Sequence, residues 1–164
     1  MLTASILFLL ALAMVIGPVM MIQPSPGMKR IAKLRSLANQ QGFNIALKPP
    51  KNTEKVIGAT YSLLCKKPLQ EQKNNNTWHL EKKSHSHDIH FYGKWDWLGS
   101  NCAPERQWPQ LERILHDIVP GITELEFNGM SVACFWDEKC GDKSEQQAID
   151  MLRELLTRLE DACV

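Results

Sequence analysis

The chain has 164 residues, with 19 Lys and Arg against 18 Asp and Glu, so its formal net charge is +1. This balance argues against a strongly basic nucleic-acid-binding protein, so nucleic acid is not an expected partner, and against an acidic disordered tail. The length supports one compact domain with an accessory segment, and 44% hydrophobic residues are enough for a core. Five cysteines, an odd number, exclude a fully paired disulfide framework.

An apolar segment opens the chain and has the length of a membrane span. Residues 2–22 form an apolar run, and the first charged side chain is Lys29. Four residues interrupt the run: Thr3, Ser5, Gly17 and Pro18. As a helix the run would extend about 32 Å, which matches the hydrocarbon core of a bilayer. We therefore expect a transmembrane helix over residues 1–23, with the lipid bilayer as the partner of residues 2–22.

Two other interpretations of this segment fit its pattern less well. A cleaved signal peptide usually places Lys or Arg before an apolar region of about 7–15 residues. Here no basic residue precedes a longer run. A buried core helix would carry polar residues on an outer face. The pattern favours the anchor over both.

Basic residues follow the apolar segment and set its expected orientation. They are Lys29, Arg30, Lys33 and Arg35. Because only this flank is positively charged, the positive-inside rule places the N-terminus outside and the rest of the chain in the cytoplasm. We expect a bacterial inner (plasma) membrane protein with a single span. The four side chains are expected to contact anionic lipid headgroups, with packing of their helix on the following domain as an equal alternative.

The sequence after the anchor divides into a short connector and one domain. Residues 24–42 combine a Pro-rich break with a basic amphipathic helix over 28–41 that ends at Gly42. Residues 43–164 are expected to form a small cytoplasmic α+β domain, with an antiparallel sheet and about three helices. Its residues 43–98 are basic and its residues 99–164 are acidic.

Strand patterns fill the first half of the domain. Alternating or β-branched residues predict strands over 43–47, 56–65, 77–82 and 87–98. Polar residues 66–76 predict a loop. In the fourth segment Phe91, Trp95 and Trp97 share one face, and Gly93 is a candidate β-bulge.

The last third of the chain predicts a helix, a hairpin and a second helix. Apolar spacing predicts a helix over 109–118. Asn128-Gly129 predicts a two-residue hairpin turn. The expected cross-strand pairs are Phe127 with Met130, Leu125 with Val132, and Thr123 with Cys134. The final helix is expected to begin near Asp142, because Asp142 and Glu145 have capping-box spacing. Its buried stripe is Ile149, Leu152, Leu155, Leu156 and Leu159.

A histidine-rich segment is the candidate metal site. His85, His87 and His90 lie within seven residues, and imidazole nitrogens suit Zn, Cu or Ni. On a strand, His85 and His87 would share one face while His90 would point away, so a three-histidine site needs a bulge or a loop. The alternative is a solvated polar turn, because short histidine tracts are only a compositional signal.

Cysteine spacing gives no further site. Cys65, Cys102, Cys134, Cys140 and Cys163 contain no C-x-x-C pair. We expect Cys134 to be a small buried hydrophobe, while Cys102 or Cys140 could form a nucleophilic pair with a histidine. The sequence also lacks a P-loop, G-x-G-x-x-G, G-x-S-x-G and H-E-x-x-H. We therefore expect no enzyme, no catalytic residue and no cofactor, and we expect most of the five tryptophans to pack in the core.

The N-terminal layout resembles one known family. An apolar helix followed by residues 23–30, Gln-Pro-Ser-Pro-Gly-Met-Lys-Arg, and a small β-containing domain is similar to the YajC-type auxiliary subunit of the bacterial preprotein translocase. The chain lacks the Gly-Asp and Thr-x-Gly-Gly turns that this family has after its basic helix. From Lys29 onward the chain also resembles uncharacterised single-pass inner-membrane proteins of proteobacteria. The resemblance implies an accessory role in a membrane complex and assigns no site residue.

The near-neutral net charge conceals two oppositely charged halves. Residues 29–94 contain 13 Lys and Arg against 4 Asp and Glu, whereas residues 95–164 contain 6 against 14. This division favours anionic lipid at one end and a basic protein surface at the other. We expect an interaction or scaffold domain in an inner-membrane complex, with an unidentified membrane-protein partner. The alternatives are a translocase accessory subunit and a metal-binding domain that uses residues 85–90.

Overall fold

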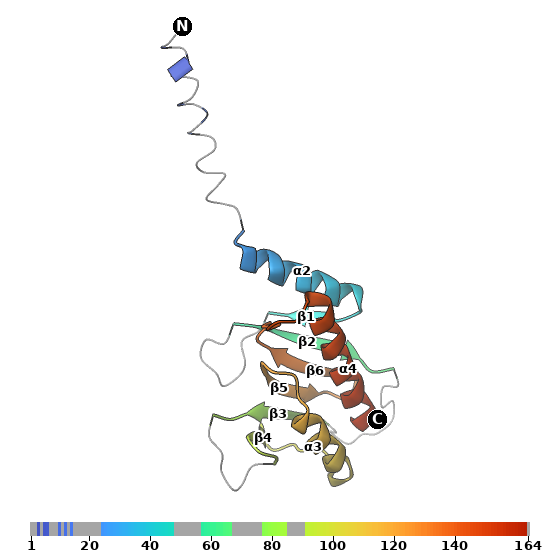
Figure 1. Ribbon diagram of the computed structural model, residues 1–164. Coiled ribbons are helices and arrows are strands. Elements are labelled where there is room, and N and C mark those ends of the chain that lie inside the picture. The colour runs from blue at the N-terminus through green and yellow to red at the C-terminus, as the bar shows by residue number, and fades with distance from the viewer. Residues whose placement is uncertain are drawn as a thin grey trace. The chain divides into compact units, whose positions relative to one another are not determined.

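The computed structural model describes residues 24–47, 57–66, 77–84 and 91–163, with six isolated positions before them (3, 5, 6, 10, 12 and 14). The chain divides into two compact units, Met1–Lys33 and Leu34–Val164. The boundary falls inside helix α2 (Pro26–Gln40). The second unit holds the sheet and the core (Figure 1).

The predicted N-terminal transmembrane helix needs correction. Among the described residues, no helix is both long enough and apolar enough to cross a membrane. α2 has 15 residues and several basic side chains, and α4 (Glu145–Cys163) has 19 residues but carries charges along its length. A span needs about 20 mainly apolar residues. The single-pass membrane arrangement is therefore contradicted, and most of residues 2–22 lie outside the described part of the chain.

The second unit is built on an antiparallel sheet, which confirms the predicted α+β class. Within the described residues the sheet has six strands in the order β1-β2-β6-β5-β3-β4. The strands are β1 (Asn44–Ala46), β2 (Ala59–Leu64), β3 (Trp78–Lys82), β4 (Trp95–Trp97), β5 (Ile122–Phe127) and β6 (Ser131–Trp136). The β5–β6 hairpin is central, with β2 paired to β6 and β3 paired to β5. Strands were therefore predicted in the right places, although β4 is much shorter than its segment.

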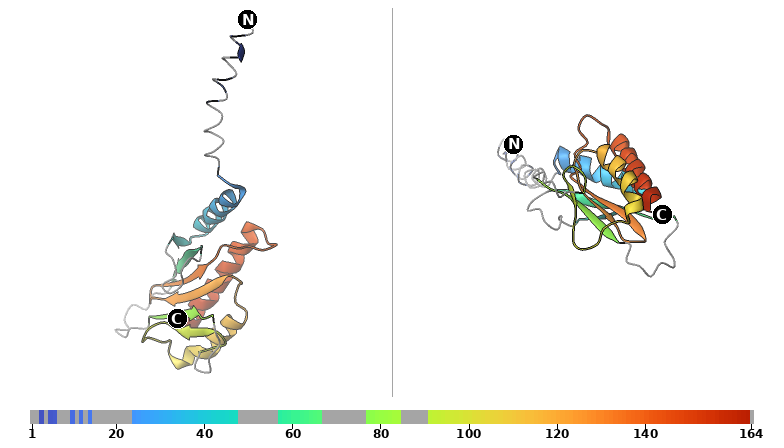
Figure 2. Two further views of the ribbon diagram at one scale, coloured as in Figure 1. Left: turned by 90° about the vertical axis from the view of Figure 1, so that its left-hand side faces the viewer. Right: turned by 90° about the horizontal axis from the view of Figure 1, so that it is seen from below.

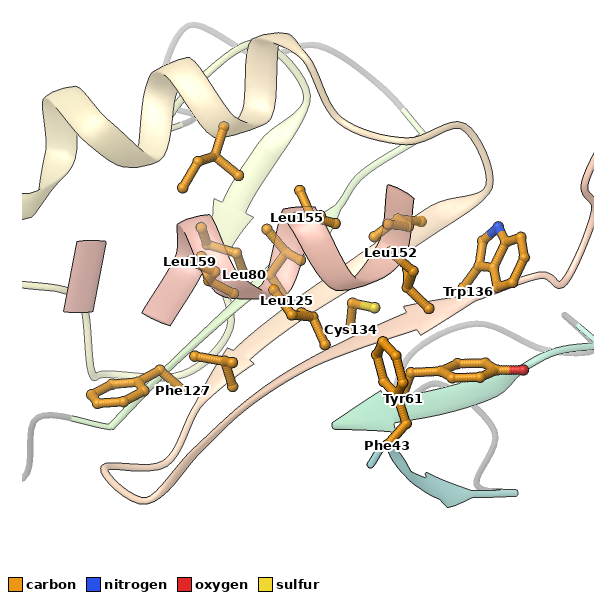
Figure 3. Close-up of a cluster of buried hydrophobic side chains, with 14 of the residues drawn as sticks. Phe43, Tyr61, Leu80, Leu125, Phe127, Cys134, Trp136, Leu152, Leu155 and Leu159 are labelled. Carbon is orange, nitrogen blue, oxygen red and sulfur yellow. The ribbon is translucent and has the colours of Figure 1, made fainter. Parts of the chain in front are cut away.

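Helices α3 (Trp108–His116) and α4 lie on the same face of this sheet (Figures 1 and 2). A 3-10 turn, η1 (Glu105–Gln107), leads into α3. The predicted stripe of α4 is buried as expected, with Leu152 and Leu156 fully enclosed. Figure 3 shows Leu152, Leu155 and Leu159 packed over the sheet residues Leu125 and Cys134. Aromatic rings continue the core at one end of this cluster: Phe43, Tyr61 and Trp136.

The β5–β6 turn is centred one residue later than expected. The observed pairs are Phe127 with Val132 and Leu125 with Cys134. Asn128 precedes the turn, and its Oδ1 accepts hydrogen bonds from the backbone N–H groups of Met130 (3.0 Å) and Ser131 (2.7 Å). Gly129, with φ +84°, then takes the first central position, as in a type II′ turn. Because the register moves by two residues, the same side chains still face the core.

Two smaller expectations about the strands also change. Gly93 (φ +59°) lies in a tight turn, in which Tyr92 and Trp95 bridge, so it is not a bulge. The irregularity falls instead in β5 between Ile122 and Glu124, and Cys134 pairs with Leu125 in place of the expected Thr123. Turn and bulge positions depend on local hydrogen bonds that alternation does not encode.

Helix α2 ends as its sequence predicts. Gly42 has φ +86°, its N–H donates to Asn39 O (3.0 Å), and the N–H of Phe43 donates to Ala38 O (3.1 Å). These two bonds form a Schellman cap, which favours glycine because of the left-handed backbone. The cap turns the chain so that Phe43 enters the core, while Leu47, at the end of the predicted strand, is 68% exposed.

Helix α4 has a capping box other than the predicted one. Ser144 Oγ accepts from the N–H of Gln147 (3.3 Å), and Gln147 Oε1 accepts from the N–H of Ser144 (3.0 Å). Each residue of the predicted pair lies two positions before its observed counterpart. Asp142 precedes the cap residue Ser144, and Glu145 is already the first residue of the helix. Both pairs have the same spacing, so spacing alone cannot choose between them.

We expect Ser144→Ala to lower the free energy of unfolding by about 1 kcal/mol, because it removes one of the two reciprocal cap bonds. Asp142→Ala is the matched control and should leave stability within about 0.5 kcal/mol. Urea denaturation followed by far-ultraviolet circular dichroism measures both. A larger loss for Asp142→Ala than for Ser144→Ala would restore the sequence-based assignment.

Candidate functional site

A pocket of about 410 Å³ lies where strand β6 ends and helix α4 begins. Three segments form it: residues 119–121, the connection from Asp137 to Lys143, and the first turns of α4. Its apolar wall comes from Val119, Trp136, Ala148 and Met151. The volume falls in the range of ordinary ligand pockets.

Trp136 fixes the floor of the pocket. The residue is 1% exposed, and its indole Nε1–H donates to Pro120 O (3.2 Å). The N–H of Asp137 donates to Gly121 O (3.1 Å), which draws the β5 approach segment against the end of β6. Gly121 has φ +86°, and a side chain there would meet the carboxylate of Asp137. The close approach therefore depends on glycine.

Two polar side chains of the pocket rim, Asp137 and Lys139, are paired with each other. Lys139 Nζ lies 3.2 Å from Asp137 Oδ2, and the Lys139 N–H donates to Asp137 Oδ1 (3.1 Å). The N–H of Lys143 donates to Cys140 O (3.1 Å). With the indole donor also engaged, the pocket mainly offers apolar contact. Charges of both signs surround that apolar centre.

Groups with shifted pKa values lie away from the pocket lining in the described residues. Burial raises the pKa of the Cys134 thiol and raises that of Cys163 to about 12. The hydrogen bond from His116 lowers the pKa of Asp117, whose side chain is 58% exposed. A polarised acid–base pair would be the signature of a catalytic pocket, and the pocket lining offers none of these groups.

A buried ion pair lies directly beside the pocket. Glu138 sits between two rim residues, and its carboxylate is 1% exposed. It accepts two hydrogen bonds from the Arg35 guanidinium, at 2.7 Å from Nε and 2.7 Å from Nη2, and one from Tyr61 Oη at 2.8 Å. The bond to Glu138 raises the pKa of Arg35, while burial and then the bond to Glu138 raise the pKa of Tyr61. We call these three residues the Glu138 network.

The backbone at Glu138 is unusual. Its φ is +59°, and it is the one non-glycine residue with positive φ in the described ranges. Such a conformation is unfavourable for a residue with a side chain and persists only where surrounding contacts determine it. The Glu138 network provides those contacts.

The predicted site residues fall in other places. His85, His87 and His90 lie outside the described residues, and the described part of the chain contains no group of three or more potential metal ligands. Lys29, Arg30 and Lys33 belong to the first unit, and their contact with lipid stays a prediction. Arg35 belongs to the second unit, where its guanidinium binds Glu138.

No disulfide joins the five cysteines, and the structure separates their environments. Cys102 is exposed, and the other four are buried. Cys134 lies in the core, as predicted. Cys140 lines the pocket, and its thiol lies 3.9 Å from Glu138 O. The predicted nucleophilic use of Cys102 or Cys140 stays untested.

Sequence reasoning did not find the pocket. Its lining comes from three separate segments, and Glu138 pairs with a residue 103 positions away. The available signals were Gly121 and the change from an apolar strand to the polar residues 137–144. Both also mark an ordinary loop.

Comparisons with known proteins add no assignment. No known protein family, no characterised protein and no solved structure matches this chain. The resemblance to the translocase subunit therefore remains an expectation from the first forty residues.

Proposed function

We propose that the second unit is a protein-interaction domain that binds one apolar side chain of a partner protein in the pocket at the β6–α4 junction. The observation that carries this proposal is the pocket itself, an apolar cavity of about 410 Å³ with Trp136 as its floor. In protein interfaces, a few anchor residues that fill such pockets supply most of the binding energy.

The pocket rim favours a side chain of a protein over a free small molecule. A small-molecule site usually has several polar groups that converge on the ligand. Here Asp137, Lys139 and the indole N–H of Trp136 are already engaged with each other or with backbone. An anchor side chain needs only the apolar cavity, since the surrounding polar rim completes the interface.

The net charge of residues 95–164 indicates which residues of the partner should flank its anchor side chain. Residues 95–164 carry eight more acidic than basic residues. A partner with Lys or Arg beside its anchor would therefore associate faster and more selectively than an acidic partner. This agrees with the basic protein surface that the sequence favours. An accessory role in a complex follows as part of the proposal.

Short peptides test the proposal directly. Acetyl-Lys-Trp-Lys-amide carries the anchor and the basic flanks, acetyl-Glu-Trp-Glu-amide reverses the flanks, acetyl-Lys-Gly-Lys-amide removes the anchor, and free indole removes the peptide. Two-dimensional ¹⁵N NMR of the full chain should show shifts at the Trp136 indole N–H and at residues 137–143 with the first peptide, and weaker shifts with the other three. Equal affinity for free indole and for the first peptide would instead assign a small-molecule site. No shift with any probe would reject the pocket as a binding site.

We expect Met151→Glu to weaken binding of acetyl-Lys-Trp-Lys-amide by about tenfold or more, because it places a carboxylate in the apolar wall. Thr157→Glu is the matched control: it lies on the same helix, is also partly buried and does not line the pocket. Its affinity should stay within about twofold of the wild type. Equal losses in the two variants would place the peptide elsewhere.

A further inference from the structure

A buried carboxylate attaches the pocket wall at residues 137–143 to the domain. Asp137 and Lys139 face the pocket, while the Glu138 carboxylate between them is buried at 1% exposure against Arg35 and Tyr61. Alternate residues of this segment therefore have different roles. Asp137 and Lys139 form part of the pocket rim, and Glu138 between them attaches the segment to the domain.

The attachment is strong and directional. The Arg35 guanidinium donates two parallel bonds of 2.7 Å to the two carboxylate oxygens, and Tyr61 Oη donates a third of 2.8 Å. Two-bond pairing between Arg and a carboxylate fixes orientation as well as distance. These contacts come from α2 and β2, which do not line the pocket.

The backbone at Glu138 requires this attachment. With φ at +59°, the residue would relax toward an ordinary conformation if its carboxylate were released. Asp137 and Lys139 would then turn with it, and both of their rim contacts would change. The shape of the pocket wall is thus linked to Arg35 and Tyr61, which do not line the pocket.

We propose that Arg35 and Tyr61 are positioning residues, which hold the pocket wall in its binding conformation through Glu138. The binding part of this inference rests on the proposed function. The positioning part does not, because it concerns the wall in the free protein.

Two conservative variants and two matched controls test the positioning. Arg35→Lys keeps the charge but removes the two-bond geometry, and Tyr61→Phe keeps the ring but removes one donor. The controls are Arg153→Lys, which removes a contact from Nη1 to Gln41 O (2.8 Å) directly after the end of α2, and Tyr92→Phe. Amide hydrogen exchange of the full chain without ligand is compared at residues 137–143 and at the β6 and α4 amides.

We expect exchange at 137–143 to accelerate about tenfold in Arg35→Lys and Tyr61→Phe, with β6 and α4 nearly unchanged, and no local effect in the controls. Affinity for acetyl-Lys-Trp-Lys-amide should fall in the same two variants. Unchanged exchange, or an equal increase over the whole domain, would overturn the positioning role. Unchanged peptide affinity in a variant whose amides at residues 137–143 exchange faster would also overturn the positioning role. If wild-type protein does not bind the peptide although the wall loosens as expected, the proposed function fails while the positioning stands.

Discussion

Arg35→Met is expected to lower the free energy of unfolding by about 3 kcal/mol, because it leaves the buried Glu138 carboxylate without its cation. That carboxylate is 1% exposed and would retain one bond, from Tyr61 Oη. Removing one member of a buried ion pair typically costs about 3–5 kcal/mol. The Arg35 side chain is 29% exposed, which places the expected loss at the low end of that range.

The triple variant Arg35→Met, Glu138→Met, Tyr61→Phe separates the two causes of this loss. If an uncompensated carboxylate causes the loss, removing all three polar groups should recover most of the stability, since apolar replacements of buried ion pairs are often neutral. Urea denaturation measures each variant, with Arg153→Met as the control for loss of a more exposed arginine. A triple variant less stable than Arg35→Met would show that the network itself adds net stability.

The elements of the fold could be predicted because periodicity reports burial. The α4 stripe from Ile149 to Leu159 and the end of α2 at Gly42 follow from spacing and from backbone conformation. The strands at 59–64 and 78–82 follow from β-branched and alternating residues. Each of these signals depends on residues that are close together in the chain, so a single sequence is enough to reveal it.

The errors arose where two local signals competed. Asn128-Gly129 was expected at the centre of the hairpin, but the side chain of Asn128 caps the turn from outside. Ser144 and Asp142 both precede a residue with capping-box spacing, and only Ser144 occupies the cap. In both cases the choice depends on which hydrogen bond forms, and the sequence contains both options.

The candidate site could not be predicted because it depends on contacts far apart in the chain. Arg35 was expected to contact lipid or to pack on the following domain, and the sequence could not indicate that it donates to Glu138, 103 residues later. The apolar run at 2–22 was interpreted by composition alone, and no membrane-spanning helix appears in the described residues. Runs of charged or apolar residues indicate which roles a segment could have. Which of these roles it has depends on the residues that pack against it.

Alkaline pH should unfold the domain, because two buried thiols must lose their protons in the unfolded chain. Burial raises the pKa of Cys134 and raises that of Cys163 to about 12, from an ordinary value of 9.0. Each thiol therefore holds its proton more tightly in the folded state. The stabilisation is fully present below pH 9 and is lost as pH rises from 9 through the folded-state value.

The expected loss is large for a domain of this size. Each thiol contributes a slope of about 1.4 kcal/mol per pH unit above pH 9, or about 3 kcal/mol by pH 11. The two together approach the whole stability of a marginal domain, about 5 kcal/mol. Tyr61, whose pKa is also raised by burial, steepens the loss in the same direction above pH 10.

Urea denaturation at pH 8, 9, 10 and 11 under reducing conditions measures this slope. The double variant Cys134→Ala, Cys163→Ala should start less stable at pH 8, because it loses buried side-chain volume, and should then lose about 5 kcal/mol less than the wild type by pH 11. Cys102→Ala, at the exposed thiol, is the control and should follow the wild-type curve. Parallel curves for the double variant and the wild type would show that Cys134 and Cys163 are not the groups that titrate. In that case Cys65→Ala and Tyr61→Phe, which each remove another buried acid with a raised pKa, identify whether Cys65 or Tyr61 accounts for the slope.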